Sequence, residues 1–202
     1  MITVELFVSG PALSPEAEHD LAQRLLMALS TEDAAPAEVM DAAREFVHVV
    51  IQQPQTWATG GPAPESARRY LARVTVPSSW SNDRRFGAHI VPLVTDTIAA
   101  TEPDPDRLRR EPHCVVQIVG LREHCTGLHG RAISTTDLTR LMTQGYRDSG
   151  VTPEAPTGAA IDPVCGMPVE LADAEFTLNV DGVDYAFCAP SCRKVFAEDT
   201  AS

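Results

Sequence analysis

The chain has 202 residues and a formal net charge of −12 at pH 7, and this length suits one medium-sized domain and one small domain. The acidity argues against a nucleic-acid partner, and no stretch approaches the roughly 20 apolar residues of a membrane span. The N-terminal sequence lacks the basic flank and long apolar run of a signal peptide, so we expect a cytoplasmic protein.

The first half of residues 1–146 follows the order strand, helix, strand. Residues 2–8 predict a strand, and a Ser-Pro-Glu helix-start signal at 14–16 precedes a helix with leucines on one face. A second predicted strand, at 46–52, leads to the sequence WATGG at 57–61. One β-α-β unit is therefore expected here.

The second half repeats this order. A predicted strand at 72–76 precedes a helix that residues 81–83 can cap, and a strand at 114–120 leads to TGLHG at 126–130. The two glycine-terminated strands align with an offset of 69 residues, which predicts two β-α-β units in tandem. Pro92 lies inside the second helix pattern and should kink or shorten that helix.

This pattern resembles the 4-oxalocrotonate tautomerase family, and the doubled unit is similar to the fused members of the tautomerase superfamily. The resemblance covers residues 1 to about 146. It implies an α+β fold in which a four-stranded sheet is backed by two helices, commonly assembled as a homotrimer. The strand edges next to the two hairpins also favour assembly, because exposed edges are normally paired or protected.

The catalytic residues of that family do not have clear counterparts here. Family members use an N-terminal proline as a general base, whereas this chain has Ile2, and the second repeat begins internally near Tyr70. The positions of the family's substrate-binding arginines fall near Leu13, at His48 and at Gln117. We therefore assign no catalytic residue. The alternative is an isomerase that uses atypical residues.

The second repeat also contains several histidines and cysteines. His124, Cys125 and His129 surround the predicted hairpin, so they could converge as a second metal site or a Cys–His nucleophile pair. The alternative is that Cys114 is a small apolar residue of a buried strand and that the histidines, His113 among them, lie on loops. The sequence leaves both interpretations open.

Residues 147–161 mix Gly, Pro, Ser, Thr and Ala without apolar periodicity, which is typical of a linker. The predicted domains are therefore 1–146 and 162–202. The second domain holds eight acidic and two basic side chains, a balance that favours cations or a basic partner. A linker of this composition permits either a docked or a roaming small domain.

Three cysteines of the small domain are predicted to meet. Cys165 lies in the sequence DPVCGM, and Cys188 and Cys192 lie in FCAPSC. Alternating apolar residues around the Asp-Gly pair at 181–182 predict a β-hairpin that ends at Cys188. Pro190 suits the first turn of a helix that contains Cys192, where the helix dipole stabilises a thiolate.

Thiolates are soft ligands that favour Cu(I), Zn(II) or iron–sulfur clusters, and a domain of about 40 residues usually needs a metal or disulfides. Three thiolates suit trigonal Cu(I) best, with Zn(II) as the alternative because it normally takes four ligands. Met167 could be a fourth, thioether ligand or a core side chain, and Asp162 could supply oxygen to a harder ion. A purely structural metal and a plain disulfide also stay open.

The two motifs, DPVCGM and YAFCAPSCRKVF, resemble the YHS domain, a relative of the TRASH metal-binding modules. The resemblance covers residues 161 to about 198 and implies a hairpin and a helix with Cys165, Cys188 and Cys192 as ligands. It further implies metal buffering, delivery or sensing, with a protein partner for metal transfer. The remaining hypothesis is a scaffold in which structural zinc holds a partner-binding domain.

Overall fold

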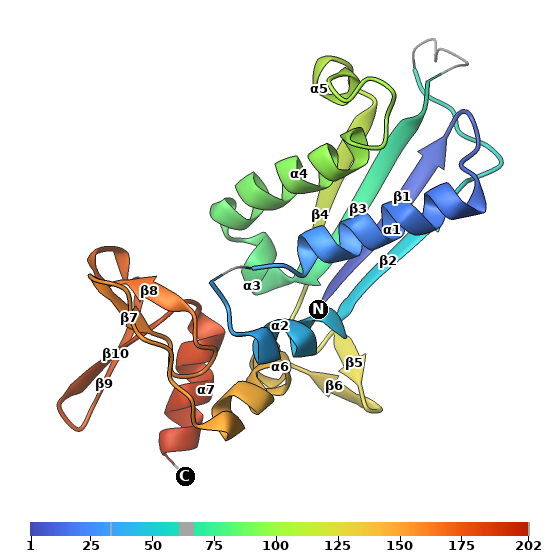
Figure 1. Ribbon diagram of the computed structural model, residues 1–202. Helices are drawn as coiled ribbons and strands as arrows, with labels where there is room; N and C mark the ends of the chain where they lie inside the picture. Colours follow the sequence, from blue (N-terminus) through green and yellow to red (C-terminus); the bar gives the residue numbers. More distant parts are fainter. Residues whose placement is uncertain (33, 61–66, 202) are drawn as a thin grey trace. The chain divides into compact units, whose positions relative to one another are not determined.

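A computed structural model describes residues 1–32, 34–60 and 67–201 (Figure 1). The chain forms two compact units. The sheet unit comprises Met1–Ser30 and Phe46–Arg122, and the cysteine unit comprises Thr31–Glu45 and Glu123–Ser202. Within the described residues, no helix has the length and apolar character needed to cross a membrane.

The sheet unit contains a four-stranded sheet with the strand order β2-β1-β3-β4. Its strands are β1 (Ile2–Ser9), β2 (Val47–Gln52), β3 (Arg69–Pro77) and β4 (Cys114–Leu121). β1 is parallel to β2 and β3 is parallel to β4, whereas the central strands β1 and β3 are antiparallel. The predicted α+β class and four-stranded sheet are therefore confirmed.

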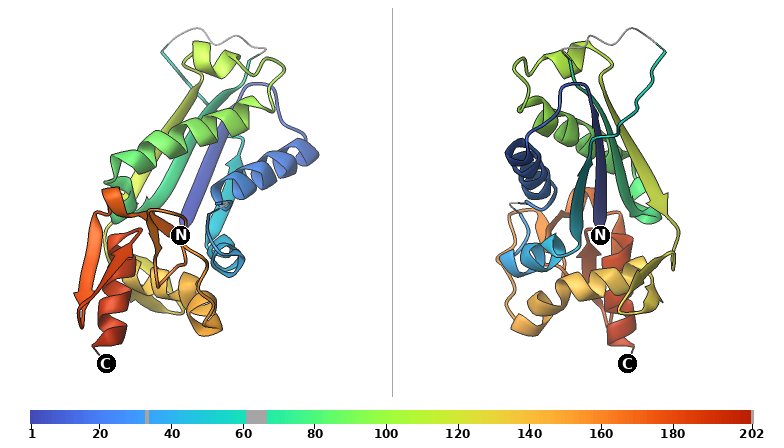
Figure 2. Two further views of the ribbon diagram at one scale, coloured as in Figure 1. Left: turned by 60° about the vertical axis from the view of Figure 1, so that its left-hand side comes forward. Right: turned by 90° about the vertical axis from the view of Figure 1, so that its right-hand side faces the viewer.

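Two long helices cover one face of this sheet (Figures 1 and 2). The helices of the unit are α1 (Pro15–Leu29), α4 (Arg84–Ala99) and the short α3 (Ser78–Ser81) and α5 (Arg107–Arg110). Ser14 caps α1 by accepting the Ala17 amide at 3.2 Å, and Asp83 caps α4 by accepting the Arg85 amide at 2.8 Å. Because α4 continues to Ala99, Pro92 does not end this helix.

Strand residues that alternate along β1 and β3 form the core with the inner faces of α1 and α4. Buried members of this core include Val4, Leu6, Val74, Leu21, Leu25, Val94 and Ile98. Burying each such side chain contributes about 1.5–3 kcal/mol before entropy losses. The other sheet face exposes Val50, Val115 and Val119 on the two outer strands.

The cysteine unit combines helices with three short antiparallel strand pairs. Its helices are α2 (Ala37–Arg44), α6 (Thr135–Ser149), α7 (Pro190–Thr200) and the 3-10 helix η1 (Leu171–Asp173). Its strand pairs are β5 (Thr126–Leu128) with β6 (Arg131–Ile133), β7 (Ala159–Ile161) with β8 (Pro168–Glu170), and β9 (Phe176–Val180) with β10 (Val183–Phe187).

This division differs from the predicted boundary at residue 146, because α6 packs against α2 and α7. Arg140 and Arg147 of α6 both form ion pairs with Asp199 of α7, at 3.0 and 2.8 Å. α6 ends at Gly150, which has a left-handed φ of 65°, and β7 starts at Ala159. The segment predicted as a linker thus contains the end of a helix and the start of a strand.

Helix α2 was not predicted from the sequence. It is inserted between α1 and β2 in chain order but belongs to the cysteine unit, where it lies beside α6 (Figure 1). The chain therefore crosses between the two units three times rather than once.

Candidate metal centre

Three segments bring the predicted cysteines together. Cys165 lies in the loop between β7 and β8, Cys188 directly follows β10, and Cys192 is in the first turn of α7. The Sγ atoms of Cys165 and Cys188 are 3.4 Å apart, and those of Cys188 and Cys192 are 3.8 Å apart. One ligand atom from each cysteine and from Asp162 lies within 4.8 Å of the others, and the cysteines are free thiols.

Local sequence explains how Cys188 reaches this place. Asp181 and Gly182 have φ values of 51° and 84°, so both adopt the positive φ of a tight hairpin turn. The rings of Tyr185 and Phe187 then pack on Phe196 of α7, with centroid distances of 4.6 and 5.4 Å. The hairpin end and the start of α7 are thereby fixed against each other.

Asp162 lies beside the thiols and is completely buried. Its Oδ1 accepts the Val164 amide at 2.9 Å, and its Oδ2 accepts the Cys188 amide at 2.8 Å. The carboxylate therefore connects the segment of Cys165 to the end of the hairpin. Burial, followed by the negative charge of Cys165, raises the pKa of Asp162 to about 6.

The thiols do not ionise independently. Hydrogen bonds from Cys188 and Cys192 lower the pKa of Cys165 to about 4. The hydrogen bond with Cys165 raises the pKa of Cys188, and hydrogen bonds with both other thiols raise that of Cys192. Cys165 is thus the thiol that ionises first, and ionisation of the other two thiols beside it would be favoured by a cation. The donor set fits a soft metal ion, which would supply that positive charge.

Burial differs among the members of the cluster. Cys165 is 5% exposed and Cys192 is 4% exposed, whereas Cys188 is an exposed residue. Both buried cysteines pack in a small apolar core with Val164, Phe187 and Val195. Cys188 is therefore the cysteine of the cluster whose residue surface reaches solvent.

The loop of Cys165 is held against two helices of the cysteine unit. Gly166 has a φ of 75°, and a Cβ atom added there would lie 2.4 Å from Pro36 Cγ and 2.8 Å from Tyr146 Cε2. Pro36 precedes α2 and Tyr146 belongs to α6. The sequence analysis missed both residues, since only the glycine after Cys165 signals a close approach.

Met167 lies partly buried against this small core, and its backbone carbonyl accepts the Asp162 amide at 2.9 Å. The side chain therefore contributes to packing. Its predicted role as a fourth ligand stays a prediction.

The histidines and cysteines of the second repeat do not form a comparable cluster among the described residues. His113 Nδ1 accepts a hydrogen bond from Arg107 at 2.9 Å, next to a strand residue, Cys114, whose pKa burial raises. His124 and His129 have positive φ values of 60° and 52° on either side of β5, and Cys125 is exposed. These positions match the interpretation of loop histidines.

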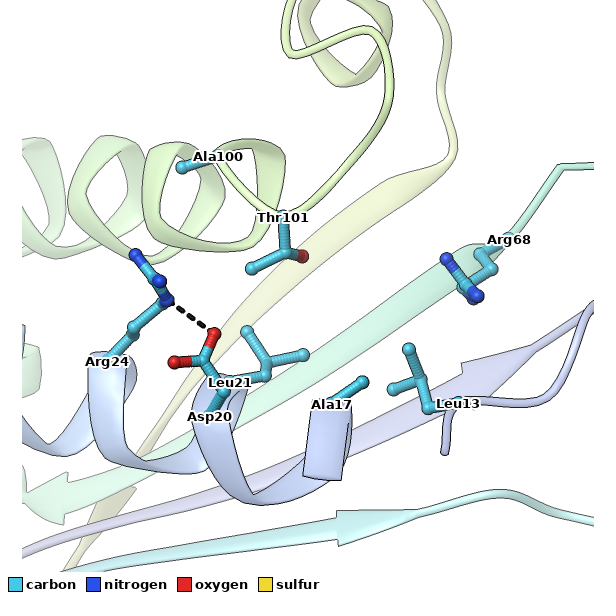
Figure 3. A pocket seen from close by; sticks show the side chains of 8 residues that line it. All are labelled: Leu13, Ala17, Asp20, Leu21, Arg24, Arg68, Ala100 and Thr101. Atoms are coloured by element: carbon cyan, nitrogen blue, oxygen red, sulfur yellow. Dashed lines mark hydrogen bonds and ion pairs between the residues drawn. The ribbon is translucent and has the colours of Figure 1, made fainter. Parts of the chain in front are cut away.

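The sheet unit has a cavity of about 320 Å³ between α1 and the end of α4 (Figure 3). Leu13, near which the resemblance places a family arginine, lines it together with Arg24 and Arg68. Arg24 donates a hydrogen bond to Asp20 at 2.6 Å, and Arg68 donates one to the Pro11 carbonyl at 2.8 Å. Both guanidinium groups already have partners within the chain, so we assign no role to this cavity.

Comparisons with known proteins bear on the fold. No protein-family model matches the chain, and no curated protein matches it. The structure of Pt0534 inactivated by 2-oxo-3-pentynoate is 14% identical, with a TM-score of 0.50, and covers 67% of this chain and 98% of its own. The cis-3-chloroacrylic acid dehalogenase family member N1 is 16% identical, with a TM-score of 0.48, over 72% and 96% of the two chains.

Native fused 4-OT is 17% identical, with a TM-score of 0.46, over 64% of this chain and 94% of its own. These neighbours are tautomerase-superfamily structures. At such low identities the similarity concerns the fold alone, and it supports a tautomerase-like fold for about two thirds of the chain.

Replacing Gly166 by alanine should destabilise the cysteine unit. A left-handed alanine costs about 1–2 kcal/mol, and overlap with Pro36 and Tyr146 adds about 1–3 kcal/mol. Gly182→Ala is the matched control, because Gly182 also has positive φ but no atom within 4 Å of an added Cβ. Denaturant unfolding of the full chain measures both variants. Equal stability of the two would contradict the close packing around Gly166.

Proposed function

We propose that this is a metal-handling protein whose cysteine unit binds one soft metal ion through Cys165, Cys188 and Cys192. The convergence of three free thiols within 4.8 Å of one another carries this proposal. Three thiolates suit trigonal Cu(I), which is the first candidate, and Zn(II) is the alternative if Asp162 or Met167 completes the set. The motifs that resemble YHS domains point to the same ligands.

Exchange of the metal, for buffering, delivery or sensing, is favoured over a purely structural role. A structural zinc site is normally closed by four ligands, whereas three thiols converge here and one of them belongs to an exposed residue, Cys188. An incoming thiolate of a partner protein could replace Cys188 while Cys165 and Cys192 still hold the ion. We propose a cytoplasmic location for the protein, because cysteine thiols stay reduced in the cytoplasm.

We further propose that the sheet unit serves as the scaffold of a homotrimer. Support comes from its open sheet face, where Val50, Val115 and Val119 are exposed. Exposed valines on strands at both sheet edges are a surface that assembly would bury.

A tautomerase-type enzyme is the second candidate, and one observation favours it. Burial lowers the pKa of the Met1 amine to about 5, so a free amine there would be uncharged at neutral pH and able to accept a proton. This property resembles the requirement for a general base, although the amine belongs to methionine rather than proline.

We expect little ketonisation of phenylpyruvate by the purified protein, because Ile2 replaces the proline and Leu13 and Gln117 cannot bind a carboxylate by charge. A spectrophotometric assay across pH separates the two candidates. Rapid turnover that disappears below about pH 5, where the Met1 amine is protonated, would favour the enzyme instead.

The open sheet face should mediate assembly. Val115→Asp places a charge on this face and should convert the trimer to monomers, as measured by sedimentation velocity at micromolar concentration. Val183→Asp is the control, since Val183 is also exposed but lies in the β9–β10 hairpin. A monomeric wild-type protein would contradict the proposed assembly.

Each of the three cluster cysteines should be required for metal binding. Serine is a poor soft-metal ligand that stays protonated near neutral pH, so each change to serine removes a charge and a bond together. We expect one Cu(I) per chain in competition titrations and a loss of affinity of at least about 100-fold for each variant, more than outer-sphere partners usually cause.

Cys125→Ser is the matched control for this titration, because Cys125 is an exposed cysteine that is not in the cluster. Its affinity should equal that of the wild type. Binding that survives all three cluster substitutions, or a Cys188–Cys192 disulfide that excludes metal under reducing conditions, would refute the metal site.

A further inference from the structure

Asp162 is the one carboxylate in the thiol cluster, and all of its hydrogen-bonding groups have partners within the described residues. Besides the two bonds of its carboxylate, its backbone carbonyl accepts the Gly166 amide at 2.8 Å, and its amide donates to the Met167 carbonyl at 2.9 Å. Two of these bonds close the turn that contains Cys165. The residue therefore shapes the loop from both its backbone and its side chain.

The bond to Cys188 has a different consequence, since it joins residues 26 positions apart. It ties the Cys165 loop directly to the backbone of a second cysteine. The Sγ atoms of these two cysteines are then 3.4 Å apart. Among the described residues, no other hydrogen bond links the backbone of one cluster cysteine to the loop of another, so the carboxylate helps to hold this spacing.

Coordination by Asp162 without a change in these bonds would have to use the lone pairs that the two amides leave free. Each carboxylate oxygen already accepts an amide, and the Val164 residue that donates one of them is only 1% exposed. Turning an oxygen toward a metal would weaken the bond to a buried N–H group, which is unfavourable. The hydrogen bonds from these amides also stabilise the negative charge of the carboxylate in its present position.

We propose that Asp162 is a positioning residue of the metal site and not a ligand, so that the donor set consists of sulfur alone. The consequence of an all-sulfur donor set is a preference for Cu(I) over Zn(II), and this consequence rests on the proposed metal-binding function. The carboxylate acts by holding Cys165 and Cys188 at the spacing that one ion can bridge.

The substitution Asp162→Asn tests this role with little change in shape. An asparagine side chain has one acceptor oxygen. Its NH2 group is a donor, so it cannot accept a hydrogen bond from the second backbone amide. One of the two hydrogen bonds between this side chain and the backbone amides is therefore lost. Asp173→Asn is the matched control, because Asp173 is an exposed aspartate of the same unit.

Amide hydrogen exchange of the metal-free full chain, followed by NMR, reports positioning without any metal. We expect the Cys188 or Val164 amide to exchange at least about 10-fold faster in Asp162→Asn, with no change in Asp173→Asn or in the sheet unit. Unchanged exchange of both amides would overturn the positioning role. If the variant does not fold, protection of these two amides in the wild type still tests their hydrogen bonds to Asp162. Rapid exchange of both amides in the wild type would overturn the proposal.

X-ray absorption of the Cu(I)-loaded wild type tests the second half of the proposal. We expect a first coordination sphere of sulfur only, and an affinity about 10- to 100-fold weaker in Asp162→Asn with the same sulfur-only sphere. An oxygen ligand that is present in the wild type and lost in the variant would overturn the proposal. If the wild type binds no Cu(I), the proposed function fails, while the exchange measurement still decides whether Asp162 positions the loop.

Discussion

The structure of the cysteine unit depends on a conflict between burial and charge. Cys165 and Cys192 belong to its small apolar core, where they pack as thiols with Val164, Phe187 and Val195. The ligand atoms of the cluster lie within 4.8 Å of one another, and this proximity lowers the pKa of Cys165 while it raises that of Cys192. A bound soft cation would resolve the conflict, because its positive charge would compensate the thiolates inside the core.

The cysteine unit is not formed by the C-terminal residues alone. The insertion that contains α2 supplies Pro36, and α6 supplies Tyr146, and both lie against the loop of Cys165. Removal of residues 162–202 would therefore expose surfaces of α2 and α6 that are covered in the full chain. Single substitutions are the sounder way to separate the metal site from the sheet unit.

Much of the fold could be predicted, because its signals are local. The caps at Ser14 and Asp83 and the Asp-Gly turn at 181–182 are determined by nearby residues, and the strands follow from alternation. The eight-residue α2 carries too short a pattern to be recognised, and its assignment to the cysteine unit depends on tertiary packing against α6. For the same reason the predicted domain boundary at residue 146 falls inside α6.

The candidate site shows the same limit. The three cysteines could be grouped by motif and hairpin geometry, but the hydrogen bond of Asp162 could not be predicted, since its partner Cys188 lies 26 residues away. A sequence shows that a carboxylate is near a ligand, whereas its hydrogen bonds decide whether it is free to coordinate. Pro36 was beyond prediction for a similar reason, because its contact with Gly166 crosses most of the chain.

Cys188 combines an exposed surface with a fixed backbone, as the proposed exchange of a metal would require. The residue is exposed, yet its backbone amide donates a hydrogen bond to the buried Asp162. In the proposed exchange, rotation of the Cys188 side chain would release the ion while this hydrogen bond holds the main chain in place. Cys165 and Cys192 are buried in the small apolar core, and this packing would keep the other two proposed ligands in position for the next ion.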